Sequence, residues 1–149
     1  MFKSVAAAVT IIAVFSTPSS VAHAATTQVV AIALQDPSVD PSISGVVMKI
    51  DTTKVKAGRV TLEAVNQWKN LVHEVLVVPA LPQGKELPYD TKKDTVVEKR
   101  VNSLGEISEL EPGASGKLTL SLNPGKYLLF CNQPGHYKAG MSTTLIVEK

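Results

Sequence analysis

The sequence is short of the residues that usually hold metals or form disulfides. Its 149 residues include one cysteine, Cys131, and three histidines. One cysteine cannot form a disulfide within the chain, so a disulfide-stapled fold is excluded. In an exported protein, where cysteines are normally paired, a single cysteine is an unused thiol, an intermolecular link, or a metal-binding or catalytic thiolate.

The charge balance argues against nucleic-acid binding. Lysine and arginine number 15 and aspartate and glutamate 13, which gives a formal net charge of +2 at pH 7. The most charged stretch, 85–100, mixes five basic with four acidic residues and indicates a solvated surface. Nucleic-acid-binding proteins usually carry a clearly basic patch. We therefore expect no nucleic-acid partner.

The first 24 residues have the layout of a secretory signal peptide. A positive start at Lys3 precedes an apolar run over 5–15, and Ala22-His23-Ala24 forms an A-x-A cleavage site. The apolar run has 11 residues, whereas a membrane-spanning helix needs about 20, so a retained anchor is the weaker alternative. No later segment is apolar enough to span a membrane. We predict export to the periplasm, cleavage after Ala24 and one mature domain over 25–149.

The mature chain has the pattern of an all-β protein. Short alternating or apolar runs are separated by Pro, Gly, Asn and Asp, and no helix of ordinary length is indicated. The stretch 80–95, which has three breaking residues and mixed charge, is predicted to be a long connection with at most a short helical turn. About eight strands at this spacing predict a Greek-key β-sandwich. The predicted strands cover 27–34, 46–50, 59–66, 71–78, 96–101, 106–110, 116–122, 126–131 and 142–147.

Four side chains stand out as candidate metal ligands. Cys131, His136 and Met141 follow one another with four residues between each pair, in the loop that joins the last two predicted strands. Pro134 and Gly135 would fold this loop back on itself. His73 lies within an apolar strand, where a histidine is costly to bury without a partner. Loss of the signal peptide removes His23, so the mature chain has no cysteine or histidine outside this set.

These residue types favour copper. Thiolate and thioether sulfur suit Cu(I), imidazole serves both oxidation states, and a trigonal His2Cys set with a weak axial Met forms a blue-copper site. Zinc could instead occupy the cysteine and the two histidines, although the methionine favours copper. Without a metal, Cys131 and His136 could form a nucleophile and base. His73 could then have a structural role, and Met141 could fill the core.

The C-terminal loop resembles the cupredoxin family, which includes plastocyanin, azurin and rusticyanin. The resemblance rests on the run 127–131, the Pro134-Gly135-His136 step and the Gly140-Met141 pair, with weaker support from 70–73. The Cys-x4-His-x4-Met spacing is most similar to that of rusticyanin-like bacterial members. The match is specific over about 40 residues in all and elsewhere is limited to the strand pattern.

The resemblance implies a role for each candidate residue. It makes His73, Cys131 and His136 equatorial copper ligands and Met141 the axial ligand of a type 1, cupredoxin-like site. It also places His136 near the surface as the electron port. The chain departs from many relatives in having Glu74, rather than asparagine, after the first histidine. We hypothesise that a Glu74 carboxylate would stabilise Cu(II) and lower the reduction potential.

The predicted function is electron transport by one copper ion between redox protein partners. We expect these partners to dock near His136 and the protein to be a monomer. It is not expected to be an enzyme, because a catalytic copper would need further histidines. Periplasmic copper trafficking or storage with the same ligands is the alternative, and a metal-free interaction domain is a third function to consider. Copper titration would separate these three functions.

Overall fold

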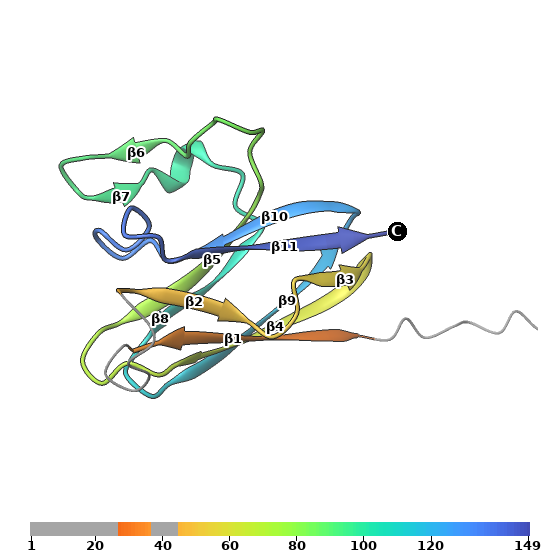
Figure 1. Ribbon diagram of the computed structural model, residues 1–149, viewed down its shortest axis with the longest axis horizontal. Coiled ribbons are helices and arrows are strands. Elements are labelled where there is room, and N and C mark those ends of the chain that lie inside the picture. The colour runs from red at the N-terminus through yellow and green to blue at the C-terminus, as the bar shows by residue number, and fades with distance from the viewer. Residues whose placement is uncertain (1–26, 37–44) are drawn as a thin grey trace, which may run out of the picture.

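The computed structural model describes residues 27–36 and 45–149. The predicted signal peptide, 1–24, and its cleavage point lie outside the described residues. Two β-sheets pack face to face, and a smaller excursion lies beside one end of them (Figure 1). No helix in the described part of the chain is long and apolar enough to cross a membrane.

The first sheet has four strands in the order β2-β1-β4-β9. Strands β1 and β4 run parallel, and the other neighbours are antiparallel. Strict alternation in β4 turns Val60, Leu62, Ala64 and Asn66 into the core, which confirms the face predicted for this strand. The strands are β1 (Gln28–Gln35), β2 (Val47–Ile50), β4 (Gly58–Asn66) and β9 (Ser115–Leu122).

The second sheet has five strands in the order β3-β11-β10-β5-β8. It carries both ends of the predicted copper loop, because that loop joins the antiparallel neighbours β10 and β11. The loop lies at the end of the sandwich opposite the C-terminus (Figure 1). The strands are β3 (Lys54–Lys56), β5 (His73–Pro79), β8 (Gly105–Leu110), β10 (Gly125–Phe130) and β11 (Ser142–Glu148).

Strand β5 is buried on both faces, which explains its unbroken apolar sequence. Val75 and Val77 belong to the core between the two sheets. Leu76 and Val78 face the other way, into a second cluster formed with residues that include Leu87 of the excursion. A strand covered on both faces has no solvent side that would favour polar residues.

The excursion, residues 80–104, connects β5 to β8. It contains a two-stranded hairpin, β6 (Tyr89–Asp90) with β7 (Thr95–Val96), followed by the 3-10 helix η1 (Glu98–Arg100). The long connection predicted over 80–95 is present, and the short helical turn lies just beyond it.

The strand predicted over 96–101 is wrong beyond Val96. Arg100 N–H donates to the Val97 carbonyl and Val101 N–H to the Glu98 carbonyl. These local bonds replace cross-strand bonds and wind the chain into the 3-10 turn. The apolar residues of this stretch suggested a strand, but such residues also occur in 3-10 turns. The surrounding structure decides which of the two forms.

The all-β sandwich is confirmed, with eleven strands in the described residues instead of about eight. The added strands are short. β3 and β6 have three and two residues and fall below the length at which a sequence pattern is visible. Several other predicted strands agree with the structure to within two residues at each end.

Candidate metal centre

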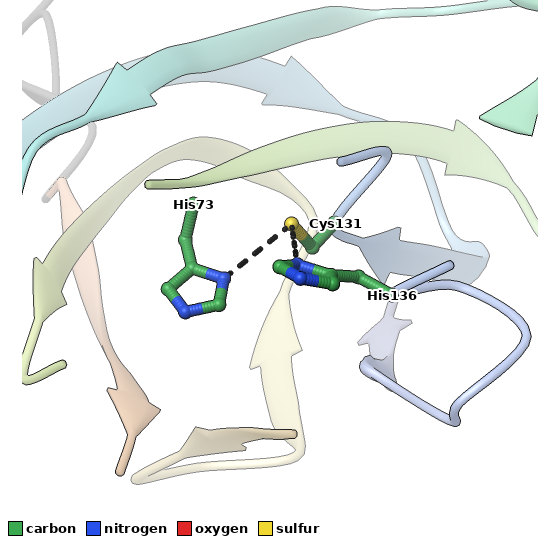
Figure 2. A group of neighbouring side chains, drawn as sticks. All are labelled: His73, Cys131 and His136. Atoms are coloured by element: carbon green, nitrogen blue, oxygen red, sulfur yellow. Dashed lines mark hydrogen bonds between the residues drawn. The ribbon is translucent and has the colours of Figure 1, made fainter. Parts of the chain in front are cut away.

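Three of the four candidate ligands converge at one end of the sandwich. Figure 2 shows the Cys131 sulfur facing a ring nitrogen of each histidine. Its Sγ lies 3.7 Å from Nδ1 of His73 and 3.4 Å from Nδ1 of His136. One ligand atom from each of the three residues lies within 4.8 Å of the other two. Two segments 58 residues apart therefore build one compact donor set.

His73 enters the site from the first residue of β5. It pairs with Leu110 of β8 and is completely buried. The pairing of β5 with β8 shifts register just after His73, and Glu109 adopts a positive φ of 31° on the opposite strand. Such a bulge re-aims the side chains beside it.

A buried asparagine, Asn66, organises the turn that leads into His73. Its Nδ2 donates to the carbonyls of Leu71 and Leu110, both at 2.8 Å, and its Oδ1 accepts from Trp68 N–H at 3.0 Å. The Trp68 ring then packs 5.4 Å, centroid to centroid, from the His73 ring. The end of β4 and the start of β5 are thereby held together around the first ligand.

The loop 131–141 is folded by its own backbone. Cys131 N–H donates to the Met141 carbonyl at 3.1 Å, and Met141 N–H donates to the His136 carbonyl at 3.0 Å. Gly135 and Gly140 have φ values of 81° and 92°, which favour glycine. The three candidate ligands in the loop are therefore joined by hydrogen bonds between their own main chains.

Met141 is completely buried in the main core beside this cluster. Its main chain is hydrogen-bonded to the main chains of Cys131 and His136. The three side chains therefore extend from neighbouring points of the backbone. These contacts are compatible with the axial position predicted for Met141. The ligand atoms that lie within 4.8 Å of one another are those of His73, Cys131 and His136.

Burial keeps both imidazoles neutral. It lowers the pKa of His73 to about 4, with a further contribution from the nearby His136, and it also lowers the pKa of His136. A neutral imidazole offers the nitrogen lone pair that a metal needs. Nε2 of His73 is buried and finds no hydrogen-bond partner in the described residues, and Nδ1 faces the sulfur.

The cysteine is protonated at neutral pH in the copper-free protein. Burial raises the pKa of the Cys131 thiol to about 11, although backbone N–H groups of Glu74 and Gln133 donate to the sulfur and act in the opposite direction. A metal that binds the thiolate must displace this proton. The same two N–H groups would then stabilise the thiolate.

Glu74 is also buried, and its side chain accepts a hydrogen bond from the backbone N–H of Asn132. Burial, followed by the nearby Glu98 and Glu106 carboxylates, raises the pKa of Glu74 to about 7. Glu74 therefore links the two segments that carry the candidate ligands.

The donors fit copper better than a purely structural cluster. A buried thiol and two neutral imidazoles that face it supply the trigonal sulfur and nitrogen set that copper prefers, and the neighbouring thioether is a soft donor.

Sequence reasoning missed the residues that support this set, among them Asn66 and the side-chain role of Asn132. The inward position predicted for Asn66 was the available signal, since a buried amide needs partners.

Comparisons with known proteins agree with this chemistry. Residues 38–148 match the family model described as copper binding proteins, plastocyanin/azurin family. No curated protein gives a significant match.

Solved structures with the same fold include rusticyanin and two auracyanins. Rusticyanin from Thiobacillus ferrooxidans is 18% identical, with a TM-score of 0.62 over 82% of this chain and 77% of that one. Auracyanin from Roseiflexus castenholzii is 23% identical, with a TM-score of 0.57 over 85% of this chain and 100% of that one. Auracyanin B is 25% identical, with a TM-score of 0.59 over 91% and 94%.

Proposed function

Because the chain belongs to the plastocyanin/azurin family of copper-binding proteins, we propose that it is an exported electron carrier. Its cofactor is one copper ion. In this proposal His73, Cys131, His136 and Met141 would hold the copper ion, which would supply one-electron chemistry through its Cu(I) and Cu(II) states.

One observation carries the proposal: the three donors converge, with one ligand atom of each within 4.8 Å of the others. A donor set that the surrounding fold holds in place can keep one arrangement for both oxidation states. Electron transfer needs such constancy, whereas a protein that hands copper on needs an exposed and reversible site. Full burial of His73 and Cys131 favours retention.

The chain's own residues have distinct tasks. The neutral imidazoles of His73 and His136 present lone pairs, and the Cys131 thiol gives up its proton as the metal binds. His136 is the least buried of the three donors, which supports its role as the electron port. Redox partners would dock on the surface around it.

Export and the absence of enzymatic activity are parts of the same proposal. The signal-peptide pattern over 1–24 supports a periplasmic location. The mature chain has two histidines, and one copper uses both, so none is left to ligate a catalytic copper. We expect a monomer, because small electron carriers must dock transiently.

Copper titration of residues 25–149 tests the proposal. We expect one equivalent of Cu(II) to give an intense blue or green colour that a mild reductant bleaches and an oxidant restores. The measurement is an absorption titration followed by repeated redox cycles. Binding of Cu(I) alone, with rapid loss to a chelator, would support trafficking, and absence of binding would leave an interaction domain.

A further inference from the structure

The amide of Asn132 forms the main side-chain link between the copper loop and the excursion. Its Oδ1 accepts from Val96 N–H at 2.6 Å, and its Nδ2 donates to the Val96 carbonyl at 3.0 Å. Nδ2 also donates to Oε1 of Glu98 at 2.8 Å. Asn132 is buried, and so is Val96. The side chain thus uses every polar atom it has on one short segment.

This pairing imitates a neighbouring strand. Val96 is opposite Tyr89 in the β6–β7 hairpin, and Asn132 meets both the N–H and the carbonyl of the same residue. An amide supplies a donor and an acceptor in one plane, as a peptide group does. An apolar residue in its place would leave two buried backbone groups unpaired, and each would cost about 1–3 kcal/mol.

The hairpin makes a second contact with the loop at its turn. Gly135 N–H donates to the Asp94 carbonyl at 2.8 Å. A Cβ at Gly135 would come within 3.1 Å of the Asp94 carboxylate, so the approach is close. The two anchored residues, Asn132 and Gly135, are the chain neighbours of Cys131 and His136. The hairpin therefore holds the loop directly beside each equatorial donor that the loop supplies.

We propose that Asn132 is a positioning residue for the copper site: its side chain docks the loop on the β6–β7 hairpin and fixes the Cys131 sulfur before the metal binds. The inference rests on the proposed copper ligands and goes beyond them, since Asn132 itself donates nothing to copper. The bond from its backbone N–H to Glu74 involves the main chain, so a side-chain substitution leaves that link in place.

The main test substitutes Asn132→Leu, which keeps the number and branching of the side-chain heavy atoms and removes all three hydrogen bonds. We expect copper affinity to fall by about 10–100-fold, as for other residues that orient metal ligands. We also expect the thiolate-to-copper absorption band to shift or to change its intensity ratio. Both are measured on folded protein, by competition with a chelator and by absorption spectroscopy.

Lys138→Met is the matched control. It removes another contact between the loop and the excursion, the exposed Lys138–Glu86 ion pair at 2.8 Å, and leaves the Asn132 amide intact. This variant should keep the wild-type spectrum and affinity. An Asn132→Leu protein that is less stable but has a wild-type spectrum and affinity would make Asn132 merely structural and overturn the proposal.

Hydrogen exchange keeps the proposal testable if Asn132→Leu does not fold. The Val96 amide of the wild-type protein should be protected both without copper and with it, because the docking precedes the metal. Fast exchange in the copper-free protein, with protection only after copper binding, would overturn the inference. Failure of the wild-type chain to bind copper would instead refute the proposed function, so the two failures are distinguishable.

Discussion

The copper loop and the excursion lie side by side, but only one of them was recognisable in the sequence. The loop, 131–141, has its donors at regular spacing and its own backbone hydrogen bonds. The excursion, 80–104, has short strands, mixed charge and no motif, yet it covers the outer face of β5 and contacts the loop at Asn132 and Gly135. The difference separates residues that do the chemistry from residues that hold them in place.

The largest expected effect comes from the loop itself. Cys131→Ser replaces the thiolate with a hydroxyl that has no low-energy charge transfer to copper, so the intense colour should disappear completely. Absorption spectroscopy after addition of Cu(II) measures this. A persistent intense band would rule out the thiolate assignment and would remove the chemical distinction between the two regions.

Met141→Leu should separate the axial position from the equatorial ones. Leucine keeps the buried apolar volume, so the site should retain copper. The reduction potential should rise, because a weak donor that stabilises Cu(II) is lost. Voltammetry of the variant beside the wild type checks the direction. Complete loss of copper binding would instead make Met141 a principal ligand.

Leu87→Ala addresses the excursion. Leu87 is buried against the outer face of β5, and truncating a buried leucine costs about 2–5 kcal/mol. We expect a lower free energy of unfolding in denaturant with the copper absorption band retained in the folded protein. Loss of the band in folded Leu87→Ala protein would show that packing of the excursion, and not only its hydrogen bonds, controls the site.

The pH dependence of the copper-free protein tests the two buried ionisable residues at the start of β5. The pKa of His73 is lowered from 6.5 to about 4, so the folded state binds fewer protons than the unfolded chain and loses stability as pH falls through that range. The pKa of Glu74 is raised from 4.5 to about 7, so its contribution has the opposite sign. The two effects oppose each other between about pH 4.5 and 6.5.

Glu74→Gln should therefore reveal the contribution of His73 to the pH dependence of stability. We expect the variant to lose about 1–3 kcal/mol between pH 6.5 and 4, because each pKa unit corresponds to about 1.4 kcal/mol, while the wild type changes less. Denaturant unfolding of the copper-free proteins at several pH values measures this. Equal slopes in the two proteins would contradict the opposing role of Glu74.

The smallest effect is expected where the two regions meet at the surface. Lys138→Met removes an exposed ion pair with Glu86, and solvent screens such pairs so that they contribute little to stability. The free energy of unfolding should be close to that of the wild type. A larger loss would mean that the surface contact, as well as Asn132, anchors the loop.

The sequence predicted those parts of the molecule whose residues follow a local pattern or are of a rare type. Alternation located β4 and the last strands, and the rarity of cysteine and histidine made Cys131 and His73 conspicuous. The structure confirmed the all-β fold, and it brings His73, Cys131 and His136 together.

The rest could not be predicted, because it depends on partners far apart in the chain. Asn132 and Val96 are 36 residues apart, and no local pattern marks either as half of a pair. The 3-10 turn at 98–100 depends on local backbone hydrogen bonds, which compete with the cross-strand hydrogen bonds that a strand would make. Asn66 could be placed on an inward face, but the three groups that satisfy it became visible only with the fold.

The direction of β11 has a practical consequence for work at surfaces. This strand leaves the copper loop at Ser142 and runs for seven residues to the opposite end of the sandwich (Figure 1), about 23 Å at the usual rise per residue. A linker attached at Lys149 would therefore hold the molecule on an electrode or bead with His136 turned outward. The metal centre proposed around His136 would then face the solution while the protein remains immobilised.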